Sequence, residues 1–402
     1  MIFSHSPSGL WELSIPRYVM RVKLRLFASY VLVAVLATVA TLTMVHLEIG
    51  LKPSKLDQLE SLIEEKFIEQ ADVTAMEDAA ADAMVKATGD RWSYYIPASE
   101  YAAYLERSEN AYVGVGMTIQ ATEDGSGFLI IEVVPGGPAE EAGIQVKDLL
   151  IRVENTDIRS LTVMEVGNLV KGTEGTSVSL TVFRQGTQET FFVQRSKVET
   201  PVATAQMLDG NIGLVTIENF DERCAEESNA AIETLLEQGA EKLIFDVRHN
   251  PGGFASELVE LLDYLLPEGD LFRTVRYDGQ EHVDISDADC LEIPMAVLVN
   301  GESYSAAEFF GAALREYEAA VVVGEPTVGK GYFQTTYQLS DGSAVSLSIG
   351  KYFTPKGVSL AENGVTPDVV VTVDENQAEE IYFGTLAPGE DPQIQAAVKA
   401  LK

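Results

Sequence analysis

Two residues in the last third of the chain have the types and positions that nucleophilic catalysis needs, and the first is Ser305. It lies in NGESYSAAEFFGAAL, where an apolar strand pattern ends at Asn300 and a polar turn leads into a helix. At the start of a helix, unpaired backbone N–H groups favour a developing oxyanion, and the N–H of Ala306 is a suitable donor. The position alone is weak evidence for a nucleophile, because a serine before a helix is usually an N-cap.

The second residue is Lys330, which stands between two glycines in VGEPTVGKGYFQ. Burial beside a serine lowers the pKa of a lysine from ~10.4 toward ~7 to 8, and the neutral amine can then act as a general base. Gln334 can hydrogen-bond this amine and orient it if Gly331 bends the chain. In a straight strand Lys330 and Gln334 would lie ~13 Å apart, so this role depends on the bend.

A third segment, DVRHNPGG, can complete an oxyanion site. Pro251, Gly252 and Gly253 let the backbone turn sharply at the carboxyl end of a strand, which is the edge where open α/β sheets bind ligands. We expect an N–H of Gly252 or Gly253 to be the second oxyanion donor, with a plain turn as the alternative. Arg248 is expected to brace this loop rather than to contact substrate.

These three segments belong to a region that alternates strand and helix patterns from Asn211 onward, and the alternation predicts an α/β core. The expected strands include IGLVTI, KLIFDV, MAVLVN and AAVVVG, and helices are expected over residues 225–238, 256–266 and 305–317. Further strands are expected over residues 332–339, 344–349 and 368–373.

Residues 112–193 follow a different pattern, in which apolar and polar residues alternate with a period of two. About five such strands and one helical pattern, LTVMEVGNLVKG, predict a small, partly closed β barrel.

Within this region, the segments GVGM and VVPGGPAEEAGIQVKDLLIRVEN resemble a PDZ domain. Such domains pair a peptide with a sheet edge and hold its terminal carboxylate with backbone N–H groups. The resemblance places that binding loop at Val113, Gly114, Val115 and Gly116, and the alternative is a strand with two glycines and no ligand.

The composition restricts the partners of the protein. Its 402 residues include 62 acidic and 28 basic side chains, which give a net charge of -34 and argue against nucleic acid as a partner. The length fits two or three domains. Cys224 and Cys290 are the only cysteines, and they can form one disulfide in an oxidising compartment or remain two thiols.

The N-terminal segment from Leu26 to Val45 contains no charged residue and at ~1.5 Å per residue reaches ~30 Å, the thickness of a bilayer core. Four Lys and Arg side chains precede it, against the single acid Glu12, which places the first residues in the cytoplasm. A cleaved signal peptide is the alternative, but the apolar run is longer than ~7 to 15 residues and no AxA site follows. We therefore expect a single-pass anchor in the cell membrane, with the catalytic part extracytoplasmic.

Together these segments closely resemble the carboxy-terminal processing peptidases, also called tail-specific proteases. The family motifs DLRNNPGG, SASASE and VGxxTxGKG correspond to DVRHNPGG, SYSAAE and VGEPTVGKG, and the resemblance extends to GDRWSYY and KYFTPKGVSLAENGVTPDVVV. It covers nearly all of the chain beyond the anchor. It implies a crotonase-like α/β core with an inserted PDZ domain. It also implies a catalytic Ser and Lys pair assisted by Gln, which fall on Ser305, Lys330 and Gln334.

The chain departs from the family pattern at three positions near these motifs. Tyr304 precedes the nucleophile, Ala307 replaces a common second serine, and His249 replaces an asparagine. None of these changes removes a catalytic group, although Tyr304 can narrow the cleft.

We expect protein or peptide substrates with free C-termini, which the PDZ domain would bind while it gates the active site. The chain is expected to have five parts. An activating partner or a homo-oligomer is left open by the sequence. The expected parts are residues 1–25 as a cytoplasmic N-terminus, 26–46 as the membrane anchor, 54–110 as a helical segment, 111–197 as the PDZ domain and 198–402 as the peptidase core.

Other mechanisms fit the sequence less well. A Ser, His, Asp triad lacks a base, because none of the histidines lies in the expected strand-turn-helix context. There is no HExxH motif, and no cofactor is implied. The alternative from another class is a catalytically silent PDZ scaffold that binds protein tails. A crotonase-like acyl enzyme is a third reading, in which the serine and lysine pair has no evident role.

Overall fold

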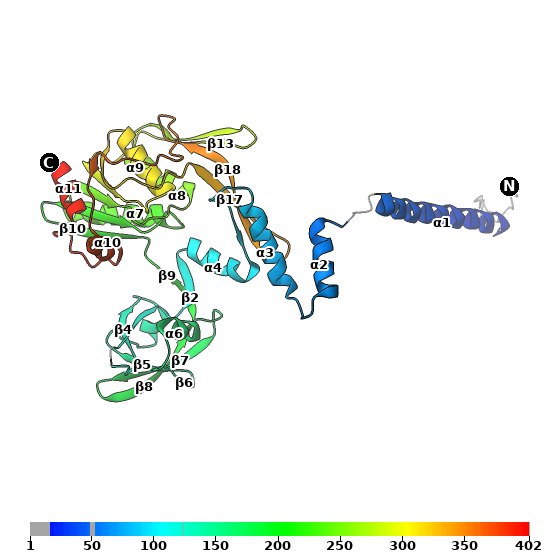
Figure 1. Cartoon of the computed structure of the whole chain (residues 1–402), viewed down its shortest axis with the longest axis horizontal. Helices are drawn as coiled ribbons and strands as arrows, with labels where there is room; N and C mark the ends of the chain where they lie inside the picture. Colours follow the sequence, from blue (N-terminus) through cyan, green and yellow to red (C-terminus); the bar gives the residue numbers. More distant parts are fainter. Residues whose placement is uncertain (1–16, 49–52, 123, 402) are drawn as a thin grey trace, which may run out of the picture. The chain divides into compact units, whose positions relative to one another are not determined.

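The computed structural model describes residues 17–48, 53–122 and 124–401, and it divides the chain into two units, residues 1–79 and 80–402. Residues 1–16 of the expected cytoplasmic N-terminus lie outside the described residues. Helices α1 and α2 belong to the first unit, and α3 crosses the boundary (Figure 1). Their bounds are α1 (Arg17–Glu48), α2 (Lys55–Lys66) and α3 (Val73–Lys86).

Helix α1 contains the predicted apolar segment. Its stretch Arg21–Thr41 is long and apolar enough to cross a membrane, with a mean hydropathy of 1.9, and none of it is buried in the chain. A membrane anchor and a signal sequence near the N-terminus both have these properties.

Residues 111–199 of the second unit form the predicted β-rich region. The described strands pair in the order β3-β4-β5-β7-β8, with β6 beside β5, around a core that includes Ile130, Leu150 and Leu180. Helix α6 begins where the Thr162 hydroxyl accepts the N–H of Glu165. The bounds are β2 (Ala111–Gly114), β3 (Met117–Ala121), β4 (Phe128–Val133), α5 (Pro138–Glu141), β5 (Leu149–Val153), β6 (Thr156–Asp157), α6 (Val163–Val170), β7 (Ser177–Arg184), β8 (Thr187–Gln194) and β9 (Ser196–Glu199).

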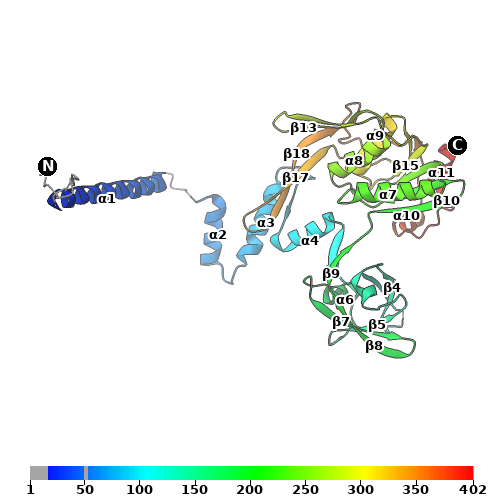
Figure 2. The same cartoon turned by 180° about the vertical axis from the view of Figure 1, so that it is seen from behind.

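The predicted α/β core is built on a sheet with the order β10-β11-β12-β15-β16-β19, in which only the β10-β11 pair is antiparallel. Strands β11, β12, β15 and β16 are buried on both faces, which explains their continuous apolar runs. Val215 and Ile217 belong to the cluster under α7, α8 and α9, while Ile212 and Leu214 pack with α11 (Figures 1 and 2). The bounds are β10 (Ala203–Leu208), β11 (Ile212–Ile217), α7 (Cys224–Glu237), β12 (Lys242–Asp246), α8 (Ala255–Leu265), β15 (Met295–Val299), α9 (Ala306–Glu316), β16 (Ala320–Gly324), β19 (Val369–Val370) and α11 (Pro392–Ala400).

The core contains a second sheet. Its central strand is the long β18, which pairs with β1, β13 and β17. The sequence did not predict β13 and β14, because their charged, partly exposed residues give no clear alternation. Their conformation is decided by pairing, of β13 with β18 and of β14 with β13. The bounds are β1 (Tyr94–Ile96), α4 (Ala98–Ser108), β13 (Gly269–Arg276), β14 (Glu281–Ser286), β17 (Tyr332–Gln338), β18 (Ala344–Phe353) and α10 (Glu375–Tyr382).

The two cysteines are free thiols, which decides between the two states that the sequence left open. Cys224 is fully buried at the start of α7, and burial raises the pKa of its thiol to about 12. A thiol with so high a pKa is a poor nucleophile, so Cys224 is a structural residue.

Candidate active site

Ser305 lies directly before α9, in a strained backbone conformation. Its φ of 60° and ψ of −122° lie outside the regions that residues with a Cβ favour. Two contacts hold the turn. The N–H of Ser305 donates to Glu308 Oε2 at 3.0 Å, and the N–H of Tyr304 donates to the carbonyl oxygen of Asn250 at 3.2 Å. Such a turn, fixed from both sides, keeps a side chain in one position.

The predicted glycine loop packs directly against this turn. A Cβ on Gly252, whose φ is +86°, would lie 2.6 Å from the Cβ of Ser305 and 2.8 Å from the N of Ala306. Only glycine fits such an approach. The N–H of Gly252 donates to Asn250 Oδ1 at 2.8 Å. Within the described ranges no hydrogen bond uses the N–H of Gly253 or of Ala306, so these two remain available to an oxyanion.

Lys330 lies in the loop between β16 and β17, and the two flanking glycines explain its place. A Cβ on Gly329 would lie 2.9 Å from the backbone of Glu362, and one on Gly331 would lie 2.6 Å from Ala361. Both glycines therefore let the lysine loop pack against residues 361–364. This packing holds Lys330 partly buried rather than on a fully solvated face.

The amine of Lys330 faces aromatic rings. Its Nζ lies 5.2 Å from the ring centre of Trp92 and 5.9 Å from that of Tyr304, and these two rings stack with centres 6.0 Å apart. Burial lowers the pKa of Lys330 to about 8, against the charges of Glu308 and Asp90, which raise it. The amine is therefore neutral in part near neutral pH, as a general base requires.

The structure places the three predicted catalytic residues in one region but does not join their side chains. Among the described residues, no hydrogen bond links Lys330 Nζ to Ser305 or to Gln334. The amide of Gln334 donates instead to the carbonyl oxygen of Tyr332 at 3.2 Å and to Ser348 Oγ at 2.9 Å. A register shift between Phe333 and Gln334 bends β17 at this point.

Glu308 connects Ser305 to the lysine loop, and sequence reasoning assigned it no role. This fully buried carboxylate accepts hydrogen bonds from the backbone N–H of Ser305 at 3.0 Å, Gly329 at 2.6 Å and Lys330 at 2.9 Å, and from the hydroxyl of Thr327. The signal was present as SAAE, in which a Glu three residues after a Ser forms half of a capping box. Glu308 therefore fixes Ser305 and Lys330 relative to one another.

Tyr352 is a second residue that sequence reasoning missed. Its phenol donates to the carbonyl oxygen of Lys330, and its side chain is 3 % exposed. Burial raises the pKa of Tyr352 well above its ordinary value, the charge of Glu308 adds to this, and a side-chain hydrogen bond with Ser305 opposes it. A neutral phenol thus contacts both Ser305 and the lysine loop.

Arg248 and His249 are both engaged away from Ser305. Arg248 binds Asp246 at 2.6 Å and Asp391 at 2.8 Å, which confirms the expectation that it braces the loop. His249 Nδ1 lies 2.6 Å from Glu302 Oε2, and its Nε2 lies 3.0 Å from Asn300 Nδ2. Because both ring nitrogens have these partners, His249 is not placed to activate Ser305.

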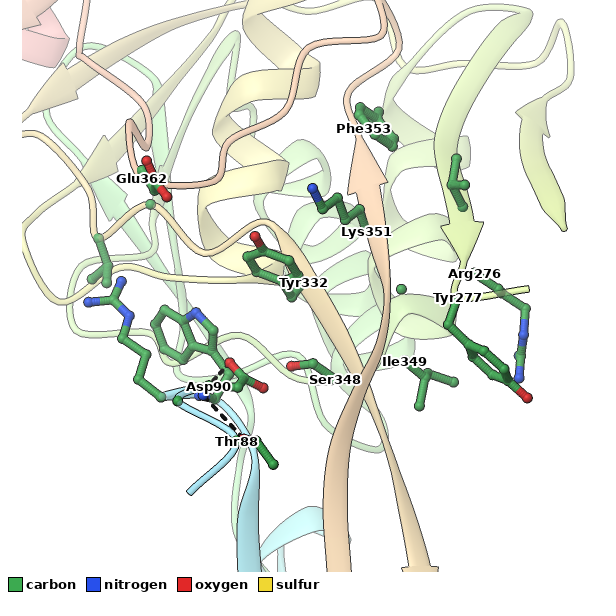
Figure 3. Close-up of a pocket in the computed structure, with 17 residues that line it drawn as sticks. Thr88, Asp90, Arg276, Tyr277, Tyr332, Ser348, Ile349, Lys351, Phe353 and Glu362 are labelled. Atoms are coloured by element: carbon green, nitrogen blue, oxygen red, sulfur yellow. Dashed lines mark hydrogen bonds between the residues drawn. The ribbon is translucent and has the colours of Figure 1, made fainter. Parts of the chain in front are cut away.

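A cleft of about 910 Å³ lies beside the lysine loop, between the loop before β1 and the second sheet (Figure 3). Figure 3 shows Asp90 on one side, opposite Tyr332 and Ser348, with Lys351 further along the cleft. Trp92 and Gly329 also line it, so the cleft reaches the immediate neighbours of Lys330. It is large enough for several residues of an extended peptide.

A separate groove of about 250 Å³ lies in the β-rich region, between β3 and α6. The predicted loop residues Gly114, Val115 and Gly116 line it, together with Val163 and Gly167 of α6. Val113 is not among the lining residues; it pairs with Lys197 of β9. A sheet edge beside a helix is the surface to which a PDZ domain adds a peptide strand.

The part of the chain that the structure describes contains no group of three or more His, Cys, Asp or Glu side chains arranged to hold a metal ion.

Comparisons with known families agree with this architecture. Residues 211–371 match peptidase family S41, and residues 106–183 match the PDZ domain family. Together with the α/β core and the β-rich region, these matches define a serine peptidase that contains a PDZ domain.

The relatives narrow this class. The carboxy-terminal processing protease CtpA of Bacillus subtilis is 30% identical over 363 residues, which cover 87% of this chain and 78% of that protein. A CtpA-like serine protease of Staphylococcus saprophyticus is 28% identical over 85% of this chain and 71% of that protein. The chain therefore belongs to the family of carboxy-terminal processing proteases, which are serine-type peptidases.

A solved structure shares the fold at lower identity. An S41 protease from Bacteroides fragilis is 17% identical, with a TM-score of 0.50 over 86% of this chain and 96% of that chain.

Activity is expected to rise with pH through about 8, the pKa of Lys330. Burial lowers this pKa, and only the neutral amine can accept a proton, so the active fraction grows about tenfold per pH unit below the pKa and levels off above it. The profile of kcat/KM against pH, with the unfolding midpoint followed in parallel, measures this limb. A plateau already reached below ~pH 6.5 would contradict the assignment, because a residue of ordinary histidine pKa would then be the base.

Proposed function

We propose that this protein is an endopeptidase that cleaves protein chains in their C-terminal regions, with Ser305 as nucleophile and Lys330 as general base. The observation that carries the proposal is the buried carboxylate of Glu308, which binds the backbone N–H groups of both residues. The lowered pKa of Lys330 supports the base role, because a lysine of ordinary pKa would stay protonated near neutral pH.

In the proposed reaction, Lys330 Nζ accepts the proton of Ser305 Oγ while the oxygen attacks the peptide carbonyl carbon. The N–H groups of Ala306 and Gly253 stabilise the resulting oxyanion. The N–H of Gly252 contributes less, because it already donates to Asn250. The protonated lysine then gives its proton to the leaving amine, and a water molecule hydrolyses the acyl-enzyme.

The proposed sequence of events begins with a movement at Lys330. Its amine rests against the rings of Trp92 and Tyr304 and must reach Ser305 Oγ before the proton can pass. Gln334 would orient the amine in that position. The cleft of Figure 3 would hold the substrate chain on the lysine side.

The remaining parts of the proposal concern architecture and location. We infer that the core is crotonase-like and that residues 111–197 form a PDZ domain whose occupancy gates the site. Helix α1 would act as a single-pass membrane anchor and place the catalytic part outside the cytoplasm, because basic residues dominate the segment before it.

A catalytically silent scaffold that binds protein tails is the second candidate function, favoured by the missing hydrogen bond between Lys330 and Ser305. A fluorophosphonate probe distinguishes the two, because it reacts with an activated serine and not with an ordinary one. Labelling of the wild-type chain that is lost in Ser305→Ala would rule out the silent scaffold.

The groove between β3 and α6 is expected to make cleavage depend on a free substrate carboxylate. Gly167→Leu would fill this groove, because a Cβ at Gly167 meets no atom within 4 Å. Hydrogen bonds to a charged group are worth ~1.5 to 3 kcal/mol, so wild type should prefer a free tail to its amide by about 10- to 100-fold, and Gly167→Leu should lose this preference. Steady-state cleavage of a matched pair of peptides measures it.

Asn376→Ala, at an exposed position of α10, is the control and should keep the preference. Equal cleavage of both peptides by the wild type would show that the groove does not select free tails.

A further inference from the structure

The chain enters and leaves the β-rich region through one joint. Asn110 directly precedes β2, and Thr200 directly follows β9, which is the antiparallel partner of β2. The N–H and the hydroxyl of Thr200 both donate to the carbonyl oxygen of Asn110, each at 2.8 Å. Any rotation of the β-rich region about its connections therefore acts on these two residues.

The joint is bound to the loop between β11 and α7 through a pair of side-chain amides. Asn110 Nδ2 donates to Asn219 Oδ1 at 3.1 Å, and Asn219 Nδ2 donates to Asn110 Oδ1 at 2.7 Å. Asn110 is 6 % exposed, and its φ of 47° is unusual for a residue with a Cβ. Reciprocal amide bonds in a partly buried setting have a fixed geometry, so the joint and the loop move together.

Arg223 of the same loop reinforces this contact. Its guanidinium donates to the carbonyl oxygens of Glu109 at 2.9 Å and Thr200 at 2.7 Å, one on the segment that enters the joint and one on the segment that leaves it. Arg223 also has a positive φ of 73°. Two residues with left-handed backbone, Asn110 and Arg223, thus face each other across the joint, and hydrogen bonds hold both in place.

The other side of this loop carries the oxyanion glycines. The N–H of Phe220, the residue after Asn219, donates to the carbonyl oxygen of Gly252 at 2.8 Å, and the N–H of Phe254 donates to that of Phe220 at 2.7 Å. A Cβ on Gly253 would lie 2.2 Å from the carbonyl carbon of Phe220, so the two backbones are in direct contact. Phe220 is fully buried and packs on Phe310 of α9. The loop cannot shift without moving Gly252 and Gly253.

We propose that Asn110 and Asn219 are positioning residues that couple the joint of the β-rich region to the oxyanion glycines next to Ser305. This inference rests on the proposed function and deepens it. When a tail occupies the groove and the region turns at its joint, the amide pair transmits the change to Phe220, which sets the Gly253 N–H relative to the nucleophile. Because the oxyanion forms only in the transition state, the coupling acts on kcat rather than on KM.

The test uses the full-length protein with Asn219→Ala and Asn110→Gly, the latter because glycine accepts the positive φ that alanine would not. For a free-tail peptide and its amide, kcat and KM are measured separately. In both variants, we expect the ratio of kcat for the free-tail peptide to kcat for the amide to fall about 10-fold, toward a value of one. The KM values should not change. The exposed substitution Asn376→Ala should keep the ratio of the wild type.

A second measurement separates this inference from the proposed function. In the Ser305→Ala background, which cannot cleave, hydrogen exchange of residues 250–254 is followed with and without the free-tail peptide. A change on binding that disappears with Asn219→Ala supports the coupling even if no substrate is cleaved. An unchanged exchange in the Ser305→Ala chain overturns it. The proposal is also overturned if Asn219→Ala lowers the unfolding midpoint but keeps the wild-type ratio of kcat for the free-tail peptide to kcat for its amide. Asn110 and Asn219 would then be merely structural.

Discussion

Ser305→Ala is expected to abolish peptide cleavage, with a loss of about 10⁴- to 10⁶-fold in kcat, because the only nucleophile of the proposed reaction is removed. Lys330→Ala and Lys330→Arg are expected to cause losses of similar size. The arginine variant is informative, because it keeps a positive charge of similar reach but cannot give up its proton near neutral pH. Cleavage of an unstructured protein by the chain without residues 1–52 measures all three.

The double variant of Ser305→Ala and Lys330→Ala sharpens this test. Two residues that act in one proton transfer do not contribute additively, so the double variant should be no less active than either single one. Persistent cleavage in both single variants would mean that other residues carry the chemistry. A wild-type protein that cleaves no substrate but still binds tail peptides would favour the alternative function, a scaffold that binds protein tails.

Glu308→Gln is expected to lower kcat about 100-fold, with a smaller effect on KM. The buried carboxylate accepts from the backbone N–H of Ser305, Gly329 and Lys330. Glutamine replaces one acceptor oxygen by an NH₂ group that faces these donors, so the nucleophile and the base lose their common support. A displacement of ~1 Å in a catalytic group can cost about 100-fold in rate.

Glu316→Gln is the matched control for this substitution. Glu316 ends the same helix, and its carboxylate accepts from the hydroxyl of Thr354 at 2.7 Å and the N–H of Lys356 at 2.8 Å, but it does not contact Ser305 or Lys330. Both variants should destabilise the fold by about 1 to 3 kcal/mol. Only Glu308→Gln should lower kcat. An equal effect of the two on kcat would reduce Glu308 to a purely structural role.

Much of the architecture could be predicted from the sequence, because it follows from local patterns. The apolar runs of β11, β12, β15 and β16 are continuous, since these strands are buried on both faces, and the helices between them begin within a few residues of the expected positions. The charged strands β13 and β14 were not predictable, because the pairing of β13 with β18 and of β14 with β13 determines them and leaves no periodic signal.

The candidate site divides in the same way. The residue types at Ser305 and Lys330 and the glycines beside them mark the site in the sequence, because sharp turns and close backbone contacts require glycine at fixed positions. The lowered pKa of Lys330 was predicted from the sequence, but the groups that surround its amine were not. The partners of Lys330 are Trp92, Tyr304 and Glu308, and residues so far apart in the chain are brought together only by packing.

The sequence by itself determined the class of chemistry, the order of the regions and the apolar N-terminal helix, because side-chain type, turn residues and hydrophobic period are local properties. Only the tertiary structure decided that the two cysteines are free thiols and that one buried glutamate binds the backbone of both Ser305 and Lys330. It also decided that Asn110 meets Asn219 beside the oxyanion glycines. Each of these depends on which distant segments share one packed interior, and that is fixed when the whole chain buries its apolar surface.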